Sequence, residues 1–166
     1  MAIIKHIVEI ACTPQELFEY LTQPWLWHEW HPNSVSATNQ GTPLRVGDEY
    51  SEIYKIRLFK SLPIMLTKHL HYEVLEVEPF SSWKVRAHTV GAVINFHYQF
   101  EPCEKGVRYT RNLDYQVRGL FRVGAPLLEK RNREMSDVAV ENIVRIMEQR
   151  SILTVKQRQA ATEQAG

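Results

Sequence analysis

The sequence of 166 residues predicts one α+β domain: a strand, two short helices, about six further strands and a long C-terminal helix. The strand segments are rich in β-branched and aromatic residues at alternating positions, and the connections between them are short. Short connections favour antiparallel neighbours. The last segment differs, because neither Gly nor Pro occurs between Pro126 and Gly166, so one long helix is expected there.

The first third of the chain carries clear boundaries between elements. Residues 3–10 are expected to form a strand whose buried face carries Ile4, His6, Val8 and Ile10. A short helix is expected from Pro14, because Thr13 can cap it and Glu16 completes a capping box. Pro24 ends that helix and opens a Trp-rich segment, for which we predict a second short helix that closes one end of the core.

The middle of the chain is expected to be an antiparallel meander. Turn residues separate segments of period-two alternation, which is typical of strands joined by short connections. The predicted strands span residues 34–38, 48–60, 68–78, 82–89, 92–101 and 107–117. We expect residues 61–67 to form an apolar loop. Its part 62–65 is predicted to border the mouth of a cavity and to move when a ligand enters.

Composition and charge narrow the function classes. The chain has 20 basic and 19 acidic residues, a formal charge of +1, which predicts no global attraction to nucleic acid or to an anionic membrane. Cys12 and Cys103 lack metal-type spacing and are expected to be free thiols. No signal peptide or membrane span can be drawn in the N-terminal residues, so we expect a cytoplasmic protein without stable membrane insertion.

The long helix presents two apolar stripes. The first combines apolar residues with Arg131 and Asn142, and its apolar members are Leu127, Leu128, Met135, Val138, Ala139 and Ile146. Either Arg131 extends its charged end to water and Asn142 finds a backbone partner, or this stripe faces a cavity. The second stripe contains Val140, Ile143, Val144 and Met147. Either the monomer covers it with its first two helices and the rim of the sheet, or it meets a second copy in a homodimer.

Two segments resemble a known family. Residues 3–32, with Trp27, Trp30 and Pro32 after the short helix, resemble the opening of the START-like (SRPBCC) superfamily, in particular its polyketide cyclase/dehydrase-like branch. Residues 106–150, including the run GAPLLEKR, resemble the last strand and closing helix of that branch. The resemblance implies a helix-grip fold, in which a curved antiparallel sheet of about seven strands wraps around the long helix and encloses an apolar cavity. Residues 1–150 would form this domain, and residues 151–166 a helical extension or frayed tail.

Arg111 is the most informative polar residue of the predicted sheet. Alternation places its guanidinium on the same side as Tyr109 and Leu113, inside the fold, where a charge needs a partner. Glu52 is the first candidate, since it shares a strand face with Tyr50 and Tyr54. Two hypotheses are open: a closed pair that shapes the core, or charged groups that contact a ligand.

The resemblance implies members that bind lipids, sterols, quinones or polyketides, and a minority that catalyse cyclisation or dehydration. We predict a binding or carrier domain for a small hydrophobic molecule. The candidate ligand-binding residues are Arg111, Glu52, Tyr54, Tyr98, Tyr109, Leu113, Met135 and Asn142. The first alternative is a cyclase/dehydrase-type enzyme, in which Arg111 stabilises an enolate, Glu52 takes a proton and a tyrosine donates a hydrogen bond. The second is a protein-interaction module like the co-chaperone relatives.

No metal, cofactor or nucleophile is predicted. His69 and His71 share a strand face with Glu73 and could approach His88, but the apolar residues of that strand occupy the opposite face, so these histidines are expected to point outward. The chain has no Gly-x-Ser-x-Gly run and no glycine pattern for phosphate binding, and neither cysteine has an evident base.

Overall fold

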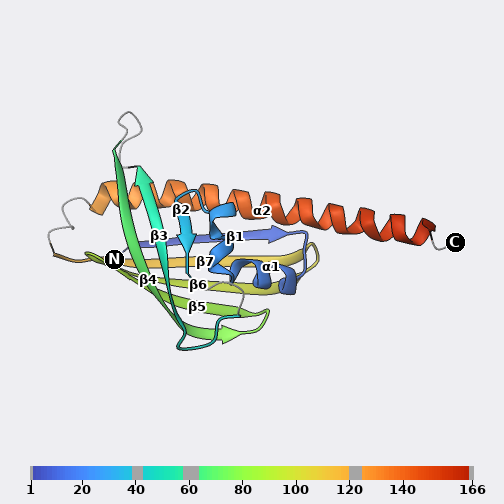
Figure 1. Ribbon diagram of the computed structural model, residues 1–166, viewed down its shortest axis with the longest axis horizontal. Helices are drawn as coiled ribbons and strands as arrows, with labels where there is room; N and C mark the ends of the chain where they lie inside the picture. Colours follow the sequence, from blue (N-terminus) through green and yellow to red (C-terminus); the bar gives the residue numbers. More distant parts are fainter. Residues whose placement is uncertain (1, 39–42, 58–63, 120–124, 165–166) are drawn as a thin grey trace.

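A computed structural model describes residues 2–38, 43–57, 64–119 and 125–164 (Figure 1). Its elements are β1 (Ala2–Ile10), α1 (Pro14–Leu21), a 3₁₀ helix η1 (Pro24–Glu29), β2 (Ser34–Ala37), β3 (Glu49–Arg57), β4 (Met65–Glu78), β5 (Ser82–Thr89), β6 (Ala92–Cys103), β7 (Gly106–Val117) and α2 (Ala125–Gln164). The strands form one antiparallel sheet in the order β1-β7-β6-β5-β4-β3-β2, curved around α2. The predicted helix-grip fold is confirmed.

The N-terminal elements follow their sequence signals. The Thr13 hydroxyl accepts a hydrogen bond from the backbone amide of Glu16, and the Glu16 carboxylate accepts one from the backbone amide of Thr13, so the predicted capping box is present. The Trp-rich segment forms η1, where the Trp27 indole donates to the carbonyl of Leu21 over 2.9 Å. The Trp27 ring contacts four other aromatic rings edge-on, those of Trp30, Tyr50, Tyr72 and Trp83. The segment therefore joins α1 to the inner face of the sheet.

The predicted strand faces agree with the structure, but one connection does not. Tyr50, Glu52 and Ile56 of β3 are buried, as alternation predicted, whereas Leu58 lies outside the described residues. The apolar loop predicted for residues 61–67 is wrong at its C-terminal end, because β4 begins at Met65. Residues 65–67 continue the ladder with β3, since the backbone pairing of Met65 with Arg57 satisfies their hydrogen bonds.

The first apolar stripe predicted for α2 is buried only in part. The side of α2 that faces the sheet carries Ser136, Ala139, Val140, Ile143 and Met147, all buried. Of the predicted first stripe, Ala139 belongs to this side, whereas Leu127 and Val138 are exposed. Apolar residues lie on two sides of this helix, so its period alone does not choose the buried side. The dimer surface predicted from the second stripe is therefore corrected: its residues pack inside one chain, with Val144 partly buried against the core.

Candidate functional site

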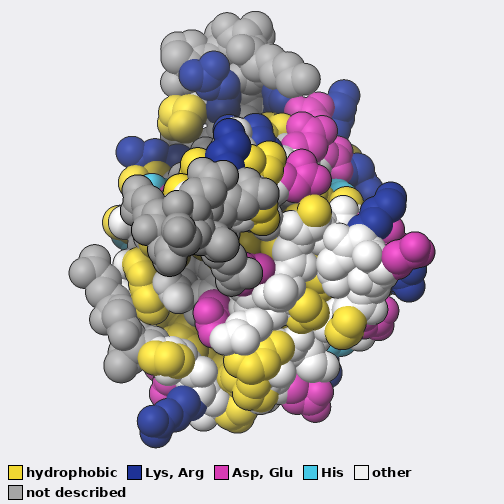
Figure 2. Space-filling view, turned by 90° about the vertical axis from the view of Figure 1, so that its right-hand side faces the viewer, with side chains coloured by type: hydrophobic (Ala, Val, Ile, Leu, Met, Phe, Trp, Pro, Cys, Tyr) yellow, Lys and Arg dark blue, Asp and Glu magenta, His cyan; other side chains and the backbone are white. Residues whose placement is uncertain are grey.

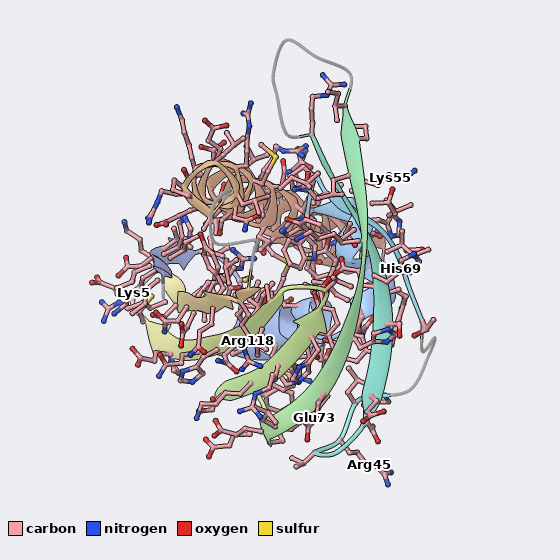
Figure 3. All side chains as sticks on the ribbon, turned by 90° about the vertical axis from the view of Figure 1, so that its left-hand side faces the viewer. Lys5, Arg45, Lys55, His69, Glu73 and Arg118 are labelled. Carbon is pink, nitrogen blue, oxygen red and sulfur yellow. The ribbon has the colours of Figure 1, made fainter. Side chains whose placement is uncertain are left out.

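A pocket lies between the inner face of the curved sheet and the N-terminal half of α2. Its walls are mainly apolar and aromatic, and its volume is about 80 Å³. It reaches solvent near the turn between β5 and β6, where Val90 is 78% exposed. The polar and charged side chains that line it are His31, Glu52, Tyr54, Lys68, Tyr72, Thr89, Tyr98, Arg111, Tyr115, Asn132 and Ser136. Figure 3 views the molecule from this end.

Arg111 occupies the centre of the sheet side of the pocket. Its neighbours across the ladder are His6 on β1 and Tyr98 on β6, so all three side chains share the inner face. The guanidinium carbon lies 5.9 Å from the centre of the Tyr98 ring, and Nη1 donates to Ser136 Oγ of α2. Arg111 is 1% exposed, yet its Nε has no hydrogen-bond partner among the described residues. A buried donor is thus left open beside the pocket.

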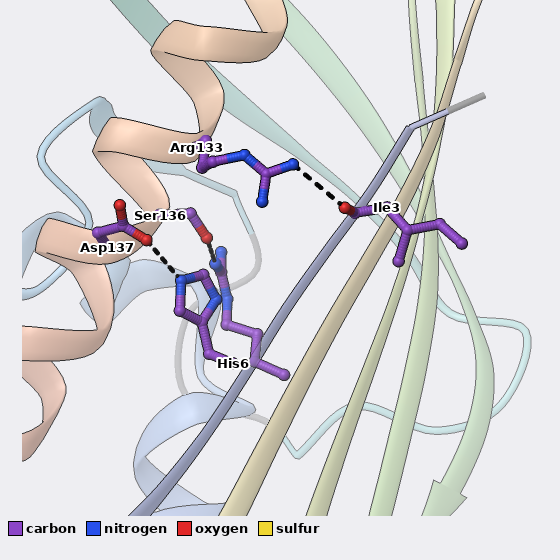
Figure 4. A network of polar contacts seen from close by, with 6 residues as sticks. Ile3, His6, Arg133, Ser136 and Asp137 are labelled. Atoms are coloured by element: carbon purple, nitrogen blue, oxygen red, sulfur yellow. Dashed lines mark hydrogen bonds and ion pairs between the residues drawn. The ribbon is translucent and has the colours of Figure 1, made fainter.

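A second polar contact ties α2 to the same strands. His6 Nε2 hydrogen-bonds to Asp137 Oδ1 over 2.7 Å, next to the Ser136 contact along the helix (Figure 4). Arg133 donates to the carbonyl of Ile3 over 3.4 Å in the same view. These bonds fix the rotation of α2 against β1, and this rotation places Ser136 in the pocket wall.

Glu52 lies on the opposite side of the pocket. The Tyr72 hydroxyl donates to its Oε2 over 2.7 Å, whereas Oε1 has no hydrogen-bond partner in the part of the chain described. Burial raises the pKa of this carboxyl to about 7, although the nearby hydroxyls of Ser34 and Tyr72 and the charge of Arg111 act in the opposite direction. The carboxyl therefore changes its protonation near neutral pH.

The predicted direct pair between Arg111 and Glu52 is not formed. Three strands, β6, β5 and β4, separate the two residues in the sheet, so they face each other across the pocket and their charges interact only at longer range. Of the two hypotheses, the closed pair is wrong. The sequence could not distinguish them, because pairing depends on how far the sheet curls.

Lys68 and His31 line the pocket although the sequence did not predict them there. Lys68 has the same parity as Leu70 and Tyr72 on β4, so alternation could have found it; burial lowers the pKa of its ammonium group. His31 follows η1 in an irregular segment without a periodic signal. Burial, together with the nearby Arg111 charge, lowers its pKa to about 3, so its imidazole is neutral at ordinary pH. Its ring contacts Tyr54 at 5.4 Å.

The structure brings five of the eight candidate residues together and places three elsewhere. Those in the pocket lining are Glu52, Tyr54, Tyr98, Arg111 and Leu113. Tyr109 is buried against Phe100 and lies outside the pocket lining. Asn142 donates to the backbone carbonyl of Trp30 over 3.0 Å, which is the predicted backbone-partner alternative, and Met135 lies outside the lining. Arg131 does not extend its charged end into water as that alternative predicted, because its side chain is 12% exposed and forms an ion pair with Glu134 at 2.6 Å.

The residues predicted for the mouth and for the outer face are also placed. Ile64 and Met65 are about half exposed and lie outside the pocket lining, while Leu62 and Pro63 fall outside the described residues. His69 and His71 point outward, as alternation predicted. No three His, Cys, Asp or Glu side chains among the described residues are grouped so that they could hold a metal ion. None of the described helices is both long and apolar enough to span a membrane.

The sheet, the gripping helix and the mainly apolar pocket define a START-like helix-grip protein. A family profile described as "Polyketide cyclase / dehydrase and lipid transport" matches residues 1–148, and the chain belongs to this family. No curated protein matches the sequence.

Solved structures share the fold at low sequence identity. An aromatase/cyclase from a Streptomyces species is 11% identical, with a TM-score of 0.68 over 90% of this chain and 95% of that chain. A protein from Nitrosomonas europaea is 16% identical, with a TM-score of 0.65 over 90% of this chain and 96% of the other. One from Rhodobacter sphaeroides is 18% identical, with a TM-score of 0.61 over 87% and 91%. These likenesses establish the fold.

Proposed function

We propose that the protein binds a small hydrophobic molecule that carries an acidic or carbonyl oxygen, such as a lipid, a quinone or an aromatic polyketide-like compound. The observation that carries this proposal is the open Nε of the buried Arg111 in a mainly apolar pocket. An unsatisfied buried donor costs about 1–3 kcal/mol, so a ligand oxygen that accepts its hydrogen bond gains this free energy on binding. The aromatic walls would cover the rest of the molecule.

The size of the pocket sets a condition on this function. Its volume of about 80 Å³ is small, whereas sites for drug-sized ligands enclose about 300–1,000 Å³. The polar group of a ligand fits this space, but a whole quinone or lipid does not. We therefore expect the pocket to widen when the ligand binds. The turn at Val90 is the expected place of this movement, because the pocket reaches solvent there and the fewest packed side chains would have to separate.

Native mass spectrometry of the purified protein tests the proposal. We expect a mass above that of the chain, and extraction into organic solvent should release one class of hydrophobic compound with a carboxyl, phenol or carbonyl group. Protein that carries nothing should then bind a matching compound added to it, such as a fatty acid, a short-chain quinone or a hydroxyanthraquinone. Failure to retain or bind any of these compounds would contradict the function.

Glu52 supports a second candidate, a cyclase/dehydrase-type enzyme. Its carboxyl has a pKa of about 7 and an open Oε1 in the pocket, which suits a group that takes and returns a proton at neutral pH. Arg111 would stabilise the negative charge of an enolate, and Tyr98 would donate a hydrogen bond. If the bound compound returns from the protein with a new ring or with one water fewer, and Glu52→Gln abolishes that change, the enzyme is supported over the carrier.

The raised pKa of Glu52 also predicts how stability depends on pH. The folded state holds the proton more tightly than the unfolded chain, whose pKa is near the ordinary value of 4.5, so stability falls as pH rises from about 4.5 through about 7. Glu52→Gln removes this dependence. The variant should match the natural protein at the acid end of this window and exceed its free energy of unfolding by about 3 kcal/mol at slightly alkaline pH.

Urea unfolding at several pH values provides the measurement. His31 titrates differently in the folded and unfolded states, but it does so equally in both proteins, so its contribution cancels in the difference. Glu76→Gln is a suitable control, because this partly exposed carboxyl, bonded to Lys84, has a lowered pKa and the opposite sign of effect. A constant difference between Glu52→Gln and the natural protein across the window would refute the raised pKa.

Cytoplasmic location and the co-chaperone-like alternative stay predictions. So does the homodimer, now without the surface first assigned to it, because that surface is buried in the monomer. Sedimentation of the purified chain at micromolar concentration measures its oligomeric state directly.

A further inference from the structure

The end of the molecule at which the pocket opens exposes several apolar side chains. Four segments lie at this end in Figures 1 and 3: the paired ends of β3 and β4, which project from the body of the molecule, the β5–β6 turn, the end of β7 and the start of α2. We name as the mouth surface the apolar residues Ile64, Met65, Val90 and Leu127, which are 48%, 49%, 78% and 38% exposed. Val90 also lines the pocket, so this surface continues into it.

Basic side chains without an opposing acid accompany the mouth surface. Arg57 lies opposite Met65 on the β3–β4 ladder, Lys68 lines the pocket, Arg118 follows β7, and Lys130 stands in the first turns of α2. None of these four residues forms an ion pair within the described ranges.

Two acidic residues of α2 near this surface are already paired with arginines of the same helix. Glu129 and Glu134 are paired with Arg133 and Arg131. The opposite end of the molecule, seen in Figure 2, displays acidic and basic side chains side by side. Basic and acidic residues are therefore distributed unevenly over the surface, although the formal net charge is only +1.

We propose that the mouth surface docks the protein reversibly on the surface of an anionic lipid bilayer, so that the pocket opens toward the membrane. Exposed apolar side chains enter the boundary between head groups and acyl chains, and the basic side chains approach the anionic head groups. The two contributions add, whereas neither a few apolar residues nor four charges alone would hold a protein on a membrane for long. A hydrophobic ligand could then pass between bilayer and pocket without crossing water.

Sedimentation with lipid vesicles tests the docking independently of any ligand in the pocket. Vesicles of phosphatidylcholine with an equal share of phosphatidylglycerol should bind the protein at low salt. Vesicles of phosphatidylcholine alone should bind it weakly, and high salt should release it. Arg118→Glu combined with Lys130→Glu should weaken binding at least about twentyfold, because each basic residue near such a surface contributes roughly a factor of five. Met65→Ser with Val90→Ser should weaken binding to a similar extent.

Matched control variants make the same kinds of substitution at exposed positions away from the mouth surface. Arg45→Glu with Lys156→Glu alters two exposed basic residues, and Val46→Ser with Ile152→Ser alters two exposed apolar residues, all away from the mouth surface. These variants should bind vesicles as the natural protein does, and thermal unfolding would show that all of the variants are folded.

Three outcomes would overturn the docking. They are absence of binding to anionic vesicles, equal binding to neutral vesicles, and equal weakening by test and control variants. Capture of a protein through the mouth surface, with vesicles left unbound, would assign the surface to a protein partner instead. Any of these results could occur while native mass spectrometry still shows a retained ligand, so the docking can fail although the binding function stands.

Discussion

Replacing Arg111 by Met should weaken ligand binding by about 1–3 kcal/mol, roughly five- to 150-fold in Kd, while the fold is retained. Met fills a similar volume and removes the buried charge together with the open Nε donor. Ser136 loses its partner, which is a small loss because a hydroxyl can turn toward another acceptor. Isothermal titration with the compound identified by extraction measures the change in Kd.

The same strand supplies a matched control for this variant. Arg108 lies on β7 with its side chain outside the fold, where it pairs with Glu9 over 3.1 Å. Arg108→Met therefore removes the same charge from the same strand without touching the pocket, and it should leave Kd unchanged. If Arg111→Met binds the ligand as tightly as Arg108→Met does, Arg111 has no part in recognition and only supports the core.

Replacing Gly106 by Ala should destabilise the fold by about 3 kcal/mol or more. Gly106 begins β7 with φ of +131°, and an added Cβ would lie 2.6 Å from the carbonyl oxygen of Ile10 and 2.7 Å from that of Cys12. These atoms belong to the backbone at the end of β1, so the clash cannot be relieved by turning a side chain. The corner that leads into α1 would have to move.

Gly47→Ala separates the two causes of this effect. Gly47 also has a positive φ, +88°, but nothing lies within 4 Å of its added Cβ. Its replacement should cost only the backbone strain, about 1–2 kcal/mol. Urea unfolding of both variants gives the comparison, and equal losses would show that the contacts with Ile10 and Cys12 do not restrict position 106.

The sequence allowed the elements to be predicted because their signals are local. Thr13 and Glu16 cap a helix that begins between them, and the strand residues alternate over distances of a few side chains. The same alternation correctly placed Glu52 and Arg111 inside the fold. Neither prediction required knowledge of which strands become neighbours.

The contacts within the candidate site could not be predicted in this way. The distance between Glu52 and Arg111 depends on the curl of five successive strands, and no residue pattern states how strongly they curl. His31 enters the pocket from an irregular segment, so its position has no periodic signal at all. The buried side of α2 was predicted only in part, because apolar residues occupy two of its sides: Ala139 lies inside as predicted, whereas Val138 is exposed.

The sequence by itself determined the order of elements, the inward faces of the strands and the presence of a carboxyl and a guanidinium inside the domain. The tertiary structure decided that these two groups stand apart with an open donor between apolar walls, and that α2 turns Ser136 and Ile143 inward. It also decided that basic and apolar residues from four segments gather at one end. The physical reason is the sequence distance over which the interactions act. Caps and alternation arise from neighbours along the chain, whereas a pocket and its mouth arise where distant strands and α2 pack together.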